Sequence, residues 1–105
     1  MKLGGKERNF RYTVNSIRQL IKMTGKTPSE VLSNFDATNF DDNVKLICCA
    51  LLWENPKLTP DIVGEWLEED DGSYTQAVTE AVNALISSFN KQFKVDIKGD
   101  EEEKN

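Results

Sequence analysis

Histidine is absent from this 105-residue chain, and cysteine occurs only as the adjacent pair Cys48 and Cys49. Without histidine, the chain lacks the side chain that most often acts as a general acid or base near neutral pH. It also lacks a common ligand of metal sites, which normally need three or four ligands. The composition therefore excludes histidine-based catalysis, and we expect neither a metal site nor a cofactor.

The two cysteines lie next to each other in an apolar segment with helical spacing, so their side chains point in different directions. A disulfide between such neighbours would be strained. We expect both cysteines to be reduced and packed in the core. A redox or metal-binding role is the alternative.

Long hydrophobic runs are missing as well. The longest uninterrupted apolar run is Leu46–Trp53, far shorter than the roughly 18 to 20 residues that span a bilayer. The first ten residues, "MKLGGKERNF", lack the apolar core of a signal peptide. We therefore expect no membrane association and a cytoplasmic protein, with one domain over residues 1–95 and a disordered acidic tail at 96–105.

Charge is distributed unevenly along the chain. The net charge is −5, but residues 1–26 hold +6 and residues 27–105 hold −11. A basic end can bind nucleic acid, yet these cations are interleaved with ordinary helix residues, and the acidic remainder would repel phosphate. We therefore interpret the basic end as a solvated face or a protein contact, with a helical DNA-binding domain as an alternative.

Apolar spacing and capping signals predict five helices between residues 13 and 93, after a short extended N-terminal arm with a Gly-Gly turn. The first helix ends at Gly25, and the second ends near Asn34. Capping boxes are expected where Thr27 precedes Glu30 and where Ser73 precedes Gln76. The predicted fold class is all-α, a small bundle of about five helices. The candidate N-caps are Thr13, Thr27, Asn39 or Asp41, Thr59 and Ser73.

The third predicted helix is unusually apolar. From Val44 to Trp53, nine of ten residues are apolar, and only Lys45 interrupts them. A helix that is apolar on all sides is normally buried on all sides. Either this helix is the centre of the bundle, or one of its faces is completed by another polypeptide.

The segment "EEDDG" closes the fourth predicted helix with four acids, which oppose the helix dipole at a C-terminus. It is a solvated loop, a contact for a basic partner or a calcium loop. The calcium loop is the least favoured of the three, because Glu68, Asp70 and Gly72 do not have the spacing of an EF-hand. Glu65 and Glu69 form a carboxylate pair but have no predicted cleft. The segment "LGGK" lacks the spacing of a phosphate-binding loop. No catalytic constellation is evident, and we expect no enzymatic activity.

The order of segments resembles the tail assembly chaperones of long-tailed bacteriophages and prophages. The resemblance covers roughly residues 8–93. It rests on a basic unit "NFRYTVNSIRQLIKMTGKTPSEVL", an acidic loop with the apolar "FDDNVKLICCALLWENPKLTPDIVGEWLEE", and a final "YTQAVTEAVNALISSFNK". Its most specific part is the apolar helix that ends in "LLWENPKLT", followed by the restart "TPDIV" and the long amphipathic helix.

The resemblance implies a non-enzymatic role in virion morphogenesis. Such chaperones keep the tape-measure protein soluble while tail tube subunits are recruited, and they are discarded before the tail is finished. We therefore expect a protein of the host cytoplasm that is not part of the mature virion. The family also implies a homo-oligomer and, in many phages, a longer frameshifted form that contacts the tail tube protein.

A chaperone for an apolar helical client needs apolar surface of its own. Because the third helix has more apolar positions than one core face needs, we expect it and the fourth helix to bind the client. The expected apolar contacts are Leu46, Ala50, Trp53, Ile62, Val63 and Trp66. The expected acidic rim consists of Glu65, Glu68, Glu69, Asp70 and Asp71. Two alternatives stay open: that these six apolar residues are core, and that the protein is a small acidic phage-encoded inhibitor or nucleic-acid mimic.

Overall fold

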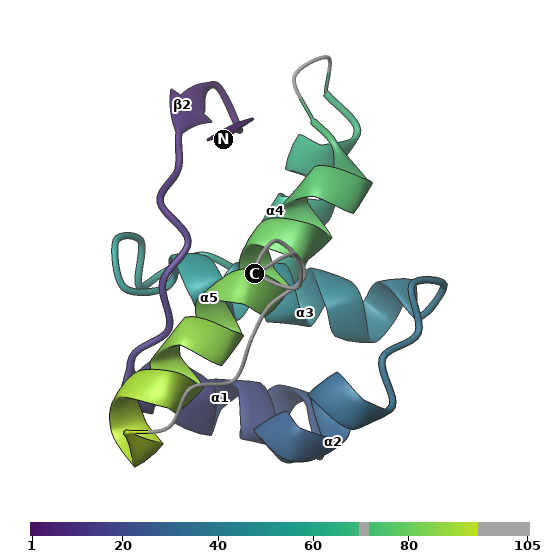
Figure 1. The fold of residues 1–105 in the computed structure, drawn as a ribbon. Coiled ribbons are helices and arrows are strands. Elements are labelled where there is room, and N and C mark those ends of the chain that lie inside the picture. Colours follow the sequence, from purple (N-terminus) through teal and green to yellow (C-terminus); the bar gives the residue numbers. More distant parts are fainter. Residues whose placement is uncertain (70–71, 95–105) are drawn as a thin grey trace, which may run out of the picture.

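The computed structural model of the chain describes residues 1–69 and 72–94 as five helices that follow a small N-terminal hairpin (Figure 1). The hairpin pairs β1 (Lys2–Leu3) with β2 (Lys6–Glu7) in antiparallel fashion. The all-α class and the extended N-terminal arm are thus confirmed, whereas the predicted tail at 96–105 lies outside the described residues. The helices are α1 (Val14–Thr24), α2 (Pro28–Ser33), α3 (Phe40–Leu51), α4 (Pro60–Leu67) and α5 (Tyr74–Phe93).

Local capping explains where each helix begins. The side chains of Thr13 and Thr27 each close a full capping box, the first with Ser16 and the second with Glu30. Asn39, rather than Asp41, caps α3 by accepting from the Asp42 amide. Thr59 and Ser73 cap α4 and α5, and Gly25 ends α1 with a left-handed φ of 70°.

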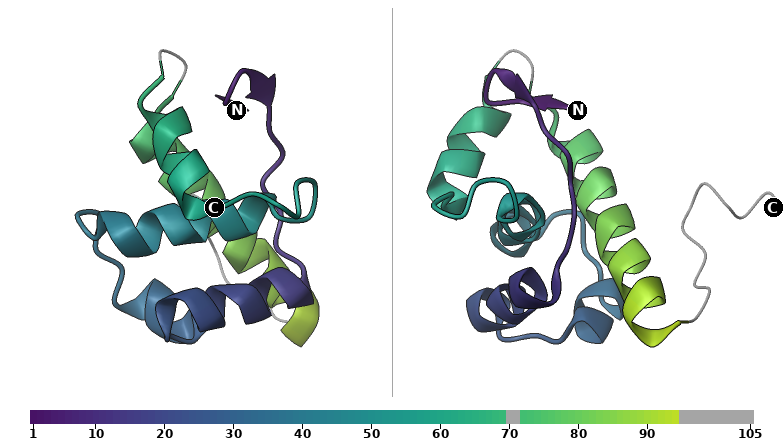
Figure 2. Two further views of the ribbon diagram at one scale, coloured as in Figure 1. Left: turned by 180° about the vertical axis from the view of Figure 1, so that it is seen from behind. Right: turned by 90° about the vertical axis from the view of Figure 1, so that its left-hand side faces the viewer.

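Helix α3 lies at the centre of the bundle. Helices α1, α4 and α5 all pack against it, and the two views in Figure 2 show it between them. Every residue from Leu46 to Leu51 is at most 1% exposed. The choice between a central helix and a face completed by another chain is therefore decided in favour of the central helix.

The extended N-terminal arm, residues 8–13, covers a further side of α3. Its Arg11 amide donates to the Ala50 carbonyl at 2.8 Å, and the Tyr12 hydroxyl donates to the Leu46 carbonyl at 2.5 Å. In addition, Trp53 Nε1 donates to the Asn9 carbonyl at 2.7 Å. Burial raises the pKa of Tyr12 well above its usual value. The arm is therefore part of the core.

The hairpin at the start of the arm is held against α4. The Arg8 guanidinium lies 4.2 Å from the centre of the Trp66 ring, and Arg8 Nε donates to the Leu3 carbonyl at 2.8 Å. Gly4 has a φ of +63°, and a Cβ at this position would overlap the Trp66 ring. Glycine is thus required at residue 4 both by backbone conformation and by the close approach of the ring.

Replacing Gly4 with alanine should destabilise the fold more than the same change at Gly5. Both residues have positive φ, but a Cβ at Gly5 meets nothing within 4 Å. We expect Gly5→Ala to lower the free energy of unfolding by about 1 kcal/mol through backbone strain alone. Gly4→Ala should lower it by about 2 to 4 kcal/mol, because the ring contact is lost as well. Urea unfolding measures both, and equal effects would show that the hairpin does not rest on Trp66.

Candidate functional site

Three of the predicted apolar contacts lie in the core. Leu46 is 1% exposed, and Ala50 and Val63 are fully buried. Because α3 is surrounded and α4 turns Val63 inward, these side chains offer no surface to a partner. Their assignment as client contacts is therefore corrected: they are core residues.

The other three predicted apolar contacts are partly exposed, but the two tryptophans among them contact the N-terminal segment. Trp53 is 39% exposed, but its ring nitrogen bonds to Asn9 and the Arg11 guanidinium lies 5.4 Å from its ring centre. Trp66 is half-buried beneath Arg8. Both tryptophans are thus partly buried, as the sequence predicts, and both secure the N-terminal segment. Ile62 is 37% exposed on α4.

The predicted acidic rim is only partly described. Glu65, Glu68 and Glu69 are exposed, and none of the three forms an ion pair within the described residues. Asp70 and Asp71 lie outside the described residues. The three described acids are therefore available to a basic partner.

Two apolar hollows of about 340 and 300 Å³ lie at successive turns of α5, and the sequence pattern alone did not reveal them. We refer to the two hollows together as the α5 groove. One side is a stripe of α5 residues at spacings of four, four, three and four: Val78, Val82, Ile86, Phe89 and Phe93. The opposite wall comes from α1, α2 and the residues around α2: Val14, Ile17, Pro28, Leu32 and Phe35.

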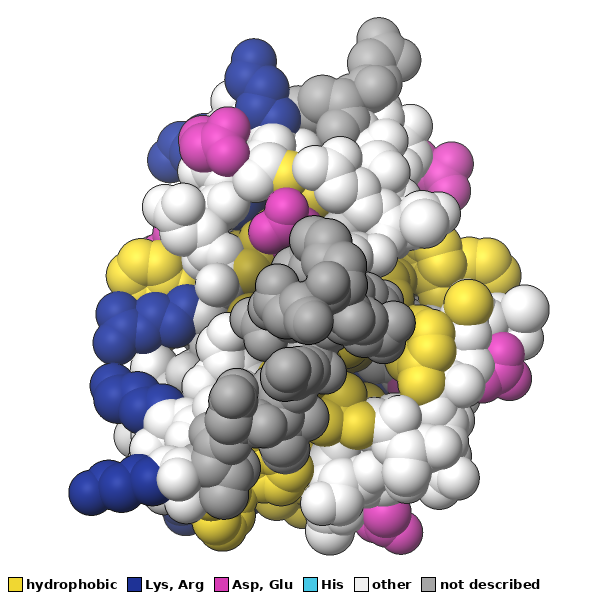
Figure 3. Space-filling model, in the orientation of Figure 1, with side chains coloured by type: hydrophobic (Ala, Val, Ile, Leu, Met, Phe, Trp, Pro, Cys, Tyr) yellow, Lys and Arg dark blue, Asp and Glu magenta, His cyan; other side chains and the backbone are white. Residues whose placement is uncertain are grey.

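Several side chains of the α5 groove are strongly exposed. Phe93 is 64% exposed, Val14 52% and Phe35 43%, and Phe89 and Phe93 make an edge-to-face contact with ring centres 4.9 Å apart. Figure 3 shows hydrophobic side chains reaching the surface between α5 and α2. Exposed apolar side chains gathered along one helix in this way are typical of a binding site for another polypeptide.

The apolar residues of α5 are not all part of the core. Ala81 and Leu85 are fully buried, whereas Phe93 near the end of the same helix is exposed. One face of a helix packs against the core over a limited arc. The apolar stripe of α5 is wider than that arc. The width of the stripe in the sequence therefore indicates that part of it stays exposed.

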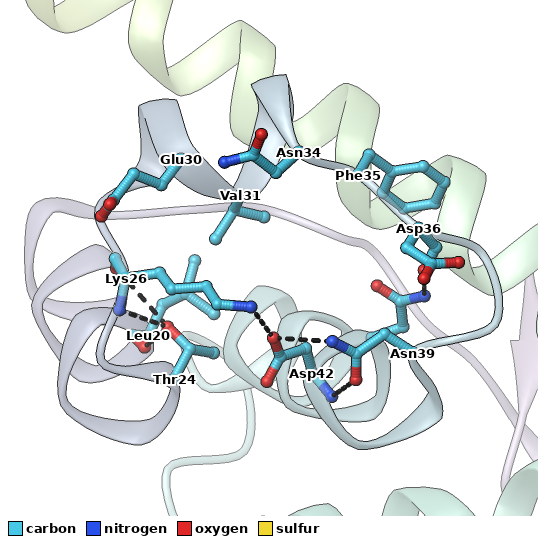
Figure 4. A pocket seen from close by; sticks show the side chains of 11 residues that line it. Leu20, Thr24, Lys26, Glu30, Val31, Asn34, Phe35, Asp36, Asn39 and Asp42 are labelled. Carbon is cyan, nitrogen blue, oxygen red and sulfur yellow. Dashed lines mark hydrogen bonds and ion pairs between the residues drawn. The ribbon is translucent and has the colours of Figure 1, made fainter.

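A small polar pocket lies where α1, α2 and α3 meet (Figure 4). Lys26 Nζ lies 2.6 Å from Asp42 Oδ2, and the Asn39 side-chain amide donates to the same oxygen at 3.0 Å. The hydrogen bond with Asp42 raises the pKa of Lys26. The pocket encloses about 20 Å³, which is room for about one water molecule. We interpret this network as structural, because the charges of Lys26 and Asp42 are paired with each other.

The two cysteines are free thiols in the core, as predicted. The Cys48 thiol faces the Leu58 carbonyl, and the Cys49 thiol faces the Met23 sulfur. Burial raises the pKa of Cys48 to about 11 and that of Cys49 to about 12. Among the described residues, no cluster of three His, Cys, Asp or Glu side chains could hold a metal ion.

The basic N-terminal residues do not all remain free for a partner. Arg8 is buried against Trp66, and Lys26 pairs with Asp42. Arg11, Arg18 and Lys22 are exposed, and Figure 3 shows Lys and Arg side chains along one edge of the molecule. The surface thus offers a strip of separate cations.

Comparisons with protein-family models, curated proteins and solved structures found no match to this chain. None of the helices within residues 1–69 and 72–94 is both long and apolar enough to cross a membrane. Function must therefore be inferred from the residues and surfaces described above.

We expect Cys48 and Cys49 to react with Ellman's reagent only when the protein unfolds. Both are buried, and their raised pKa values keep them protonated at pH 8. Their thiols ionise near pH 9 in the unfolded chain, so the free energy of unfolding should fall as pH rises from about 9 to 12. The labelling rate at pH 8 should match the unfolding rate and rise with urea. Rapid labelling of the folded protein would contradict a core role.

Proposed function

We propose that this protein is a non-enzymatic chaperone of phage tail assembly that holds an amphipathic helical segment of the tape-measure protein in the α5 groove. The observation that supports this is the groove itself: several of its apolar side chains, among them Val14, Phe35 and Phe93, are exposed in the isolated chain. The order of sequence segments, which resembles the tail assembly chaperones, suggests the identity of the client. An apolar groove can hold the apolar face of a helix without any chemical reaction.

The dimensions of the α5 groove suit a client helix. From Val78 to Phe93 the stripe spans fifteen residue steps, or about 22 Å at 1.5 Å per residue. A client helix of four turns would fill this length, with apolar residues at three- and four-residue spacing. Burial of its apolar face contributes roughly 25 cal/mol per Å² before the costs of association.

The polar rim of the groove indicates which helix fits. Along its lining, Thr79, Asn83 and Gln92 are uncharged, and Arg18 is the one charged side chain among the described residues there. The best occupant is therefore a helix with an apolar face, mostly uncharged flanks and an acidic residue near Arg18. That acid would also set the direction in which the client helix lies.

The rest of the surface fits the same proposal. A net charge of −5, with Glu65, Glu68 and Glu69 exposed, keeps a protein with an open apolar groove soluble. Without client, a second copy of the chain would cover the groove, so the proposed homo-oligomer and the client compete for one surface. Recruitment of tail tube subunits would then use other surfaces, in this chain or in a longer form.

The double variant Phe35→Ser, Phe93→Ser should lose the ability to keep tape-measure fragments soluble. Both rings are exposed in the groove, so their removal should weaken client binding by about a hundredfold with little loss of helicity. The assay co-expresses the chain with helical fragments of a tape-measure protein, and compares the soluble fraction of each fragment.

Phe40→Ser is the matched control for this assay. Phe40 is 60% exposed but packs on Tyr74, outside the α5 groove. It should keep the fragments soluble at the level of the unchanged chain. If the double variant stays helical and still keeps the fragments soluble, the α5 groove is not the client site.

A further inference from the structure

A second cleft lies between the N-terminal arm and α5. This arm cleft is about 340 Å³ in volume and is lined by arm residues 10–13, by Val14 of α1 and by α5 residues between Ala84 and Gln92. The right-hand view of Figure 2 shows the arm passing between the loop after α3 on one side and α5 on the other. The cleft therefore lies along the edge of the arm that faces away from Trp53.

Beyond Arg8, whose backbone pairs with that of Met1, residues 9–12 of the arm pair their backbone along only one edge. The Asn9 carbonyl and the Arg11 amide are bonded to Trp53 and Ala50. In an extended chain, the backbone groups of alternate residues point to opposite sides, so those of Phe10 and Tyr12 face the arm cleft. Within the described residues, neither backbone amide nor backbone carbonyl of Phe10 and Tyr12 has a hydrogen-bond partner. The arm thus presents an open strand edge.

A buried hydroxyl lies in the opposite wall of the arm cleft. Ser88 is 6% exposed, and its Oγ finds no hydrogen-bond partner among the described residues. Leaving a buried hydroxyl unpaired costs stability, so such groups are rare in folded proteins. A ligand that enters the cleft and bonds to Ser88 would remove that cost.

The charges around the arm cleft all have one sign. Arg11 and Lys91 are the charged side chains in its lining as described, and both are exposed, although the Arg11 guanidinium also lies 5.4 Å from the centre of the Trp53 ring. Helix α1 begins at the cleft with Val14, and its first turn holds no acidic residue. Two cations and the positive end of a helix favour a ligand with carboxylates.

We propose that the arm cleft binds an extended acidic segment of a partner protein. The segment adds as a strand along the open edge of the arm, so that its main chain bonds to Phe10 and Tyr12. Its carboxylates meet Arg11 and Lys91, and one polar group reaches Ser88. A helix does not fit this site, since its own backbone groups are already paired. This proposal does not depend on the α5 groove or on the nature of its client.

The direct test titrates the full ¹⁵N-labelled chain with an acetylated eight-residue peptide that alternates threonine and glutamate. We expect the amide signals of Phe10 and Tyr12 to shift most, and the affinity to fall as salt concentration rises. The matched probe alternates threonine and lysine and should cause no such shifts. If the acidic peptide leaves these two amides unchanged at millimolar concentration, or if both peptides act alike, the proposal is overturned.

Single substitutions measure how much individual residues of the arm cleft contribute to peptide binding. Ser88→Ala should raise the melting temperature by roughly 2 to 5 °C, since it removes an unpaired hydroxyl, and should weaken peptide binding by about tenfold. Lys91→Gln should also weaken binding, whereas Lys22→Gln removes an equal charge outside the cleft and should not. Phe93→Ser, which alters only the α5 groove, should leave peptide binding intact. Unchanged affinity in both Ser88→Ala and Lys91→Gln would place the peptide elsewhere.

Discussion

The contact between the N-terminal arm and the buried carbonyls of α3 is the constraint on which the rest of the structure depends. The C-terminal half of α3, Leu46–Leu51, is buried on every side, and three helices do not enclose it completely. The arm supplies the missing wall: its Arg11 amide satisfies the Ala50 carbonyl at the end of α3, and the buried Tyr12 hydroxyl finds its own partner in the Leu46 carbonyl. An extended segment thus completes a helical core.

Both candidate binding sites follow from the way α3 is covered. The arm uses one backbone edge to reach α3, which leaves its other edge open to the arm cleft. Helix α5 uses Ala81 and Leu85 to cover α3, which leaves the neighbouring stripe exposed in the α5 groove. The two sites differ in chemistry because one is formed by backbone and the other by apolar side chains. The way in which α3 is covered therefore leaves two candidate binding sites that differ in chemistry.

Features with local causes could be predicted from the sequence, and features with long-range causes could not. The bounds of α1 and α2 follow from Thr13, Gly25 and Thr27, whose capping acts within a few residues. Which face of α5 is covered depends instead on where α3 lies. Likewise, Ser88 is an ordinary polar residue of a helix until the arm packs beside it. The α5 groove and the arm cleft therefore emerged only from the three-dimensional arrangement.

The two sites adjoin each other, and this limits how they can be used. Val14 and Gln92 line both the arm cleft and the α5 groove. On α5, Lys91 belongs to the cleft and Phe93 to the groove, so ligands in the two sites would meet at the end of this helix. Two separate partners would then compete for space at Val14. A single partner with an extended acidic stretch next to an apolar helix would instead gain from both sites at once, because the second contact forms at high effective concentration.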